Sequence, residues 1–148
     1  MKKIIAILSL AMMTNISAQT LKNVAYKDGS QKLNALVTDN TNQKRPAVLI
    51  LPAWKGIDNE AKQAALDLQK EGYIALIADI YGEGNIPKTN EEASKIATTY
   101  KTDYKAYQHR INLALEALIK QNADPKKIAV IGYCFGGTGA LEVARAGF

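Results

Sequence analysis

Within residues 21–39, two stretches in which apolar residues alternate with polar ones flank the turn signal Asp28-Gly29-Ser30. Alternation of this kind is typical of strands with one face buried and one face in water. Two such strands joined by a short turn form a β-hairpin. The start of the chain after residue 20 is therefore predicted to be a hairpin.

Three unbroken apolar runs follow, at residues 47–51, 73–78 and 128–131. A strand that is covered on both faces shows no alternation, so each run predicts a buried strand. Helical spacing is found at 58–71, from 90 onward, at 102–121 and at 138–145, with Asp58 and Asn90 as predicted N-caps. Strands that alternate with helices imply a parallel sheet with helices on both faces. The sequence thus predicts an α/β fold in which a hairpin precedes a parallel sheet.

The first residues form a separate pattern. Met1-Lys2-Lys3 is basic, residues 4–13 are apolar apart from Ser9, and small residues end the stretch at Ala18. This order is typical of a secretory signal peptide and is too short for a membrane-spanning helix. We therefore expect cleavage after Ala18 and export of a domain comprising residues 19–148. No cysteine directly follows the apolar run, so neither a lipid anchor nor stable membrane association is expected.

The charge of the chain argues against nucleic-acid binding, and its single cysteine points to a functional thiol. Loss of residues 1–18 removes two lysines and no acid, so the net charge falls from +5 to +3. The other Lys and Arg residues are scattered among acids without a basic stripe, which gives nucleic-acid binding no support. Cys134 is the only cysteine, so it cannot form an internal disulfide. An unpaired thiol in an exported protein requires a functional reason.

Gly132-Tyr133-Cys134-Phe135-Gly136 places that cysteine at the centre of a Gly-x-nucleophile-x-Gly pattern. The pattern lies between a predicted buried strand and a predicted helix, which is the context that gives it meaning. Glycines allow neighbouring backbone to pass close to such a turn. The adjacent helix N-terminus favours the thiolate, which is the attacking form. We interpret Cys134 as a nucleophile, against the alternative of a small buried apolar residue.

Acyl transfer by a thiol also needs oxyanion donors and a base. The backbone N–H of Phe135 is one predicted donor, and the loop after the first parallel strand normally supplies the second, here at Trp54 or a neighbour. A packing role for Trp54 is equally open. His109, the only histidine, lies on a helix away from the expected site and is a poor candidate for the base.

In this architecture an acid and then a histidine follow the nucleophile in chain order. We therefore expect the sequence to be an N-terminal part of a longer enzyme, or a truncated product. The sheet would then end at an interior strand with an unpaired edge.

The segment Gly132-Tyr-Cys-Phe-Gly-Gly137 resembles the elbow of the dienelactone hydrolase family of α/β-hydrolases. Ala78-Asp-Ile-Tyr-Gly82 and Asp124-Pro-Lys-Lys-Ile128 also match the family. The resemblance covers nearly all of the mature chain and implies the α/β-hydrolase fold, with Gly132, Gly136 and Gly137 as elbow glycines. It implies a Cys-Asp-His triad whose Asp and His lie beyond residue 148, and hydrolysis of small esters or lactones without metal or organic cofactor.

The sequence departs from the family at Ala53, where enzymes that open dienelactone carry a glutamate that helps to activate the cysteine. The mode of activation and the substrate therefore stay open. Two other classes remain. Glutamine amidotransferase-like enzymes also place a cysteine on a strand-to-helix turn, but without this glycine framing. A non-catalytic exported binding protein on a hydrolase scaffold is compatible with Ala53 and the absent base.

Overall fold

The computed structural model describes residues 20–38 and 43–147, so the predicted signal peptide lies outside the described residues. The strands of the described residues form one sheet in the order β1-β2-β4-β3-β5. Their bounds are Leu21–Asp28 (β1), Gln31–Thr38 (β2), Arg45–Leu51 (β3), Ile74–Ile77 (β4) and Ala123–Gly132 (β5).

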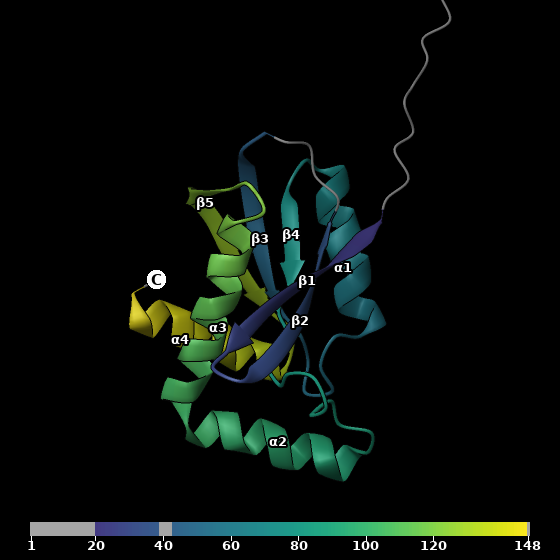
Figure 1. Cartoon of the computed structure of the whole chain (residues 1–148), viewed down its shortest axis with the longest axis vertical. Helices are drawn as coiled ribbons and strands as arrows, with labels where there is room; N and C mark the ends of the chain where they lie inside the picture. Colours follow the sequence, from purple (N-terminus) through teal and green to yellow (C-terminus); the bar gives the residue numbers. More distant parts are fainter. Residues whose placement is uncertain (1–19, 39–42, 148) are drawn as a thin grey trace, which may run out of the picture.

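The predicted hairpin and parallel sheet are both confirmed. β1 and β2 pair in an antiparallel manner, and β4, β3 and β5 run parallel, with β3 between the other two (Figure 1). The hairpin joins the parallel strands through a short antiparallel pairing of β2 with β4, from Leu36 opposite Ile77 to Val37 opposite Leu76. The carboxyl ends of the parallel strands therefore lie at one edge of the sheet, where α/β proteins bind their ligands.

The helices are Asn59–Lys70 (α1), Asn90–Thr102 (α2), Tyr104–Ile119 (α3) and Phe135–Ala146 (α4). Asp58 caps α1 as predicted, because its carboxylate accepts a hydrogen bond from the Ala61 N–H at 2.9 Å. Thr89 and not Asn90 caps α2, with its hydroxyl accepting from the Glu92 N–H at 3.1 Å. In the described part of the chain, no helix is long and apolar enough to cross a bilayer.

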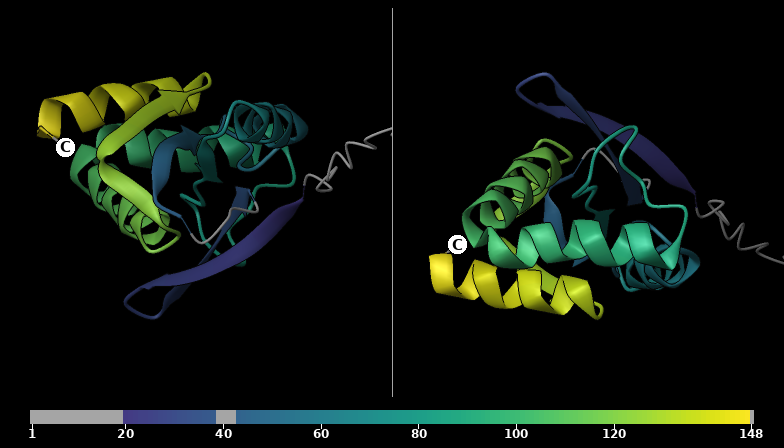
Figure 2. Two further views of the ribbon diagram at one scale, coloured as in Figure 1. Left: turned by 90° about the horizontal axis from the view of Figure 1, so that it is seen from above. Right: turned by 90° about the horizontal axis from the view of Figure 1, so that it is seen from below.

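The sheet is covered on both faces, as predicted. On one face Val48, Ile50, Ala75 and Ile77 pack with α1. On the other face the remaining core residues of β3 and β4 pack with α3 and α4. The twisted sheet curves around α3, so that β1 at one edge and α4 near the other both contact this helix (Figure 2). The core thus holds α3 and α4 against the strands that carry the elbow.

The strand before the elbow is less buried than its apolar run predicts. β5 pairs with β3 on one side and forms the edge of the sheet within the described residues. Ala129 is exposed, and Ile128, Val130 and Ile131 are only partly buried. The strand also begins at Ala123, earlier than predicted, with an irregularity opposite Arg45 and Ala47. The apolar run at residues 128–131 correctly predicted a strand. Within the described residues this strand has no neighbour on its outer side, which is the unpaired edge that the sequence predicted.

Thr38 extends the short pairing between β2 and β4. Its side chain is buried, and its hydroxyl accepts a hydrogen bond from the Ala75 N–H at 3.0 Å. In Thr38→Val this N–H stays buried without its acceptor, so the free energy of unfolding should fall by about 1–3 kcal/mol in urea denaturation. Thr99→Val is the matched control, because the Thr99 hydroxyl is exposed and bonds within its own helix. Equal stability of the two variants would contradict a structural role for Thr38.

Candidate active site

Cys134 lies at the junction of β5 and α4 in a strained backbone conformation, with φ 49° and ψ −107°. A positive φ is uncommon for a residue other than glycine and is often found at functional sites. Its side chain is exposed and forms no disulfide. α4 begins at Phe135, three residues earlier than predicted, so the chain passes from strand to helix at Cys134 itself. The turn therefore presents the thiol to solvent directly before the helix N-terminus.

Two of the three predicted elbow glycines lie where a side chain would collide with backbone. A Cβ at Gly132 would approach the Gly136 carbonyl oxygen to 2.1 Å, and a Cβ at Gly136 would approach the Leu51 carbonyl oxygen to 2.0 Å. A Cβ at Gly137 would make only an ordinary 3.6 Å contact with the Gly132 oxygen. The tight packing of the elbow thus depends on Gly132 and Gly136, whereas Gly137 is free of this constraint.

The loop after β3 packs directly against the elbow. The Tyr133 N–H donates to the Leu51 carbonyl at 3.1 Å, which continues the β3–β5 pairing up to the turn. A Cβ on Gly136 would also lie only 2.8 Å from the Pro52 carbonyl oxygen, so the two backbones touch. The structure therefore brings the loop that contains Trp54 beside Cys134 and Phe135, as the sequence predicted.

The two predicted oxyanion donors are backbone N–H groups. Phe135 is the first residue of α4, and N–H groups in the first turn of a helix have no carbonyl partner in their own helix. Trp54 lies in a turn closed by a 3.0 Å hydrogen bond from the Gly56 N–H to the Ala53 carbonyl. The Trp54 side chain is half-buried and packs against the main core, so packing is part of its role whatever its N–H does.

An aromatic cluster of Tyr81, Tyr100, Tyr107 and Phe135 packs at the start of α4, next to the elbow. The rings of Tyr107 and Phe135 stack with centroids 4.7 Å apart, and the Tyr81 ring stacks on Phe135 at 5.9 Å. Tyr100 contacts both tyrosines, at 5.8 Å each. The Tyr107 hydroxyl donates to the Phe135 carbonyl at 3.3 Å. Residues from the loop after β4, from α2 and from α3 thereby fix the first residue of α4.

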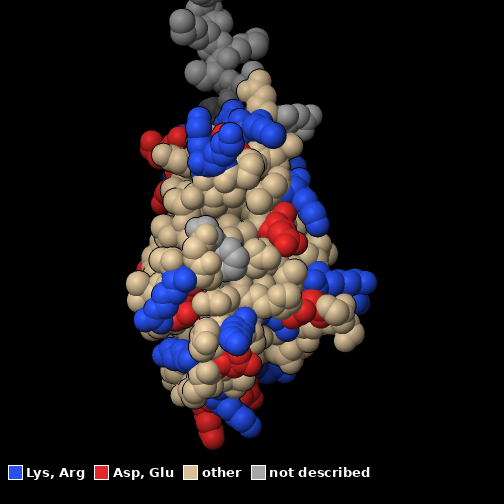
Figure 3. Space-filling model, turned by 90° about the vertical axis from the view of Figure 1, so that its left-hand side faces the viewer, with Lys and Arg blue, Asp and Glu red and all other residues tan. Residues whose placement is uncertain are grey.

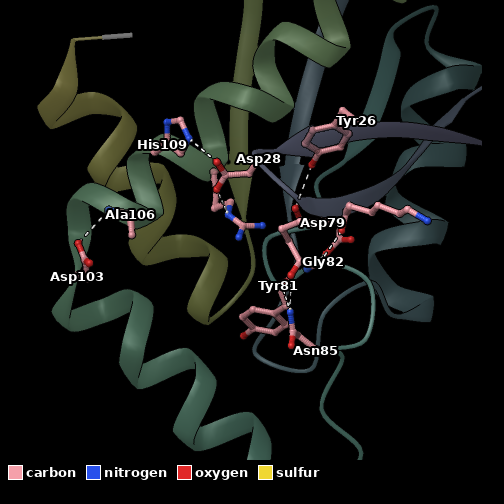
Figure 4. Close-up of polar contacts among 12 residues, drawn as sticks. Tyr26, Asp28, Asp79, Tyr81, Gly82, Asn85, Asp103, Ala106 and His109 are labelled. Carbon is pink, nitrogen blue, oxygen red and sulfur yellow. Dashed lines mark hydrogen bonds and ion pairs between the residues drawn. The ribbon is translucent and has the colours of Figure 1, made fainter.

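Asp79 holds the loop that follows β4 (Figure 4). Its buried carboxylate accepts hydrogen bonds from the Asn34 N–H at 2.9 Å and the Gly82 N–H at 2.8 Å. The Tyr26 hydroxyl donates to the Asp79 carbonyl at 3.0 Å. A buried carboxylate with two N–H donors is well satisfied. Asp79 therefore links the hairpin to the loop that carries Tyr81.

His109 lies apart from the elbow. Its Nε2 is 3.0 Å from an oxygen of Asp28, at the tip of the hairpin, and its side chain is exposed (Figure 4). Arg110 binds the other Asp28 oxygen at 2.8 Å. Tyr107, which contacts Phe135, lies two residues earlier, so His109 points about 200° away around the helix. The only histidine of residues 1–148 thus belongs to a polar cluster with Asp28 and Arg110 and not to the surroundings of Cys134.

Sequence reasoning missed three residues that shape the site: Tyr81, Tyr107 and Gly139. Their contacts are long-range, so no local pattern marked them. A Cβ at Gly139 would lie 2.5 Å from the Tyr107 hydroxyl and 2.9 Å from a Leu51 methyl carbon. For Gly139 the spacing Gly136-Gly137-x-Gly139 was an available signal, since glycines on a helix often permit a close approach by a neighbouring element. For Tyr81 the family match of Ala78-Asp-Ile-Tyr-Gly82 marked the segment but not the contact.

Alkaline pH is expected to destabilise the aromatic cluster. Burial raises the pKa of Tyr26, Tyr81, Tyr100 and Tyr107 above their ordinary value of 10.0. A raised pKa in the folded state stabilises the fold fully below the unfolded value, and this contribution is lost as the pH rises above about 10. Phenolate absorbance from these residues should appear together with loss of the native circular dichroism. Complete phenolate formation in a chain that keeps its native spectrum would contradict this.

Charges are mixed over the face shown in Figure 3, apart from a small group of basic side chains toward its upper end. Within residues 20–38 and 43–147, no three or more His, Cys, Asp or Glu side chains gather in a group that could hold a metal ion.

Comparison with known proteins gives a consistent picture. The profile of the Dienelactone hydrolase family matches residues 33–147. A Bradyrhizobium protein with the name "Probable 2-oxo-3-(5-oxofuran-2-ylidene)propanoate lactonase" is 33% identical over 121 residues, which cover 80% of this chain and 48% of that protein. An Aquifex aeolicus protein, provisionally named a carboxymethylenebutenolidase, is 30% identical over 104 residues, covering 67% of this chain and 45% of that protein.

The fold agrees with these relatives. A dienelactone hydrolase-like promiscuous phosphotriesterase from metagenomic libraries has a crystal structure that matches with a TM-score of 0.81 and 32% identity, covering 88% of this chain and 56% of the other. The chain spans about half the length of the relatives it matches. Its sheet, with a cysteine on the turn between β5 and α4, has the α/β-hydrolase fold, and the chain belongs to the dienelactone hydrolase family.

Proposed function

We propose that the protein is a carboxylic-ester or lactone hydrolase that uses Cys134 as a covalent nucleophile. The observation that carries the proposal is the exposed Cys134 in its strained turn, between a parallel strand and a helix, with Gly132 and Gly136 packed against backbone. Membership of the dienelactone hydrolase family supports the reaction class. The names of the related lactonase and carboxymethylenebutenolidase support a small ester or lactone as the substrate.

In the proposed reaction, Sγ of Cys134 attacks the carbonyl carbon of the substrate. The carbonyl oxygen takes the negative charge of the tetrahedral intermediate, which the N–H groups of Phe135 and Trp54 stabilise. A base takes the thiol proton and passes it to the departing alkoxide, which leaves as the alcohol. Water then attacks the thioester, which releases the carboxylic acid and restores the thiol.

The base is the part of this reaction that the described residues do not provide. His109 is bound to Asp28 and faces away from Cys134. We propose a family-type Cys-Asp-His triad whose Asp and His come from protein beyond residue 148. Ala53 occupies the position of the family glutamate, so activation of Cys134 in this protein does not use a carboxylate at that position.

Assays of the protein expressed from its complete reading frame test the proposal. Nitrophenyl esters of short acids and simple lactones should be hydrolysed, with no release of ammonia from glutamine. Iodoacetamide should label Cys134 faster than it labels a small free thiol, because catalytic thiols carry more thiolate. Glutaminase activity would favour an amidotransferase-like enzyme. Slow, unselective labelling together with inactivity toward esters would favour a non-catalytic binding protein.

We further propose that the protein is exported after cleavage of residues 1–18. The basic start, the apolar run and the small residues before Gln19 support this. When the protein is expressed in a bacterium and the cells are fractionated, the exported form should begin at Gln19 in N-terminal sequencing. Protein that keeps Met1 and remains in the cytoplasm would contradict export.

A further inference from the structure

Tyr81 connects the two loops at the carboxyl edge of the sheet. Its side chain is buried, and its hydroxyl donates a hydrogen bond of 2.8 Å to the Trp54 carbonyl. The bond is partly buried, so water competes for this carbonyl less than it would for an exposed one, and the bond restrains the backbone of the loop more firmly. Burial also raises the pKa of the Tyr81 phenol, so the hydroxyl keeps its proton.

The same side chain contacts the start of α4. The Tyr81 ring stacks on Phe135, with an interplanar angle of 28°. Tyr107 also holds Phe135 in place. The Tyr107 ring stacks on the Phe135 ring with an interplanar angle of 6°, and the Tyr107 hydroxyl donates a hydrogen bond to the Phe135 carbonyl. One tyrosine therefore touches both residues whose N–H groups are the proposed oxyanion donors.

Tyr81 is itself held in place by its own loop. Asp79 bonds the Gly82 N–H, and the Asn85 side chain donates to the Tyr81 carbonyl at 3.1 Å (Figure 4). Gly82 takes a φ of 90°, which lets the chain turn directly after Tyr81. The network from Asp79 through Tyr81 to Trp54 thus joins the ends of β4 and β3 at the site.

We propose that Tyr81 is a positioning residue that sets the spacing of the two oxyanion donors by holding the Trp54 loop and the Phe135 ring together. It does not touch the substrate in this proposal. The catalytic part of the inference rests on the proposed function, since the donors matter only if an oxyanion forms. The positional part concerns the loop alone and can be measured without a substrate.

The test is Tyr81→Phe, with Thr99→Val as the control. Both variants lose a side-chain hydroxyl that donates to a backbone carbonyl, at Trp54 and at Lys95 respectively. The shared loss of one such bond controls for a general loss of stability. Trp54 is the only tryptophan of residues 1–148, and subtracting the signal of a Trp54→Phe variant isolates its fluorescence as a reporter on the loop.

In the protein from the complete reading frame, Tyr81→Phe should lower kcat for ester hydrolysis about 10- to 100-fold with KM within about threefold, because donors that act in the transition state are displaced. The acrylamide quenching constant of Trp54 should rise about twofold as the loop loosens. Thr99→Val should leave both quantities near wild type, because the Thr99 hydroxyl is exposed and bonds only within α2.

Wild-type kcat and wild-type quenching in Tyr81→Phe would overturn the inference. A lower kcat without any change at Trp54 would also overturn it, since the effect would then arise elsewhere. If the wild-type protein hydrolyses no ester, the proposed function fails, and the quenching data alone decide whether Tyr81 holds the loop. Increased quenching supports the positional role in that case, and unchanged quenching rejects it.

Discussion

Cys134→Ala should reduce kcat for ester hydrolysis by about 10⁴-fold or more, since removal of a covalent nucleophile leaves only binding and oxyanion stabilisation. Cys134 is the only cysteine of residues 1–148, so no other thiol in this part of the protein can take its place. The fold should persist, because the side chain is exposed and forms no disulfide. Steady-state kinetics with a nitrophenyl ester, together with circular dichroism, measure both effects.

His109→Ala is the control for this experiment. Its imidazole is exposed and bound to Asp28, so its removal should change kcat by less than about threefold, as expected for a surface residue outside the site. A Cys134→Ala protein that keeps its activity would refute the nucleophile. A His109→Ala protein that loses activity would show that the cluster at the hairpin tip reaches the chemistry.

Gly136→Ala should strongly destabilise the elbow. The added Cβ would lie 2.0 Å from the Leu51 carbonyl oxygen and 2.8 Å from the Pro52 oxygen, and both are backbone atoms that cannot rotate away. β3 or α4 must move, so the free energy of unfolding should fall by at least about 3 kcal/mol, at the upper end for overpacking. Urea denaturation followed by Trp54 fluorescence gives the value.

Gly137→Ala is the matched control on the same helix. Its Cβ would meet only the Gly132 oxygen at 3.6 Å, and alanine favours a helix over glycine by up to about 1 kcal/mol. Gly137→Ala should therefore be neutral or slightly stabilising. Similar stability losses in the two variants would show that the elbow does not depend on the close approach of α4 to the end of β3.

The elements that carry local patterns could be predicted from the sequence. Alternation marked the hairpin, unbroken apolar runs marked β3 and β4, and the glycines around Cys134 marked the turn into α4. The α/β class with a parallel sheet followed from the order of these elements, and the α/β-hydrolase fold was implied by the resemblance of the elbow to the dienelactone hydrolase family. Cys134, Phe135 and Trp54 were placed at one edge because parallel strands end together there, and the structure brings their segments together.

Features that depend on distant contacts could not be predicted. The unpaired edge at β5 was expected and is present in the described residues, but the exposure of Ala129 was not expected, because an unbroken apolar run is typical of a strand covered on both faces. The Tyr81 hydroxyl reaches Trp54 across 27 positions of sequence, and no local spacing records such a bond. The cap at Thr89 is a local feature that the sequence analysis missed: Thr89-Asn-Glu-Glu92 has the spacing of a capping box, with the Glu92 side chain bonding the Lys88 N–H.

The most direct test of the account is to look for the acyl-enzyme. The protein from the complete reading frame is mixed with a nitrophenyl ester, quenched in acid within the first turnover, digested and examined by mass spectrometry. The account predicts the acyl group as a thioester on Cys134, in the peptide that contains Gly132 and Gly136. Steady turnover of the ester with an unmodified Cys134, or with the acyl group on another residue, would contradict it.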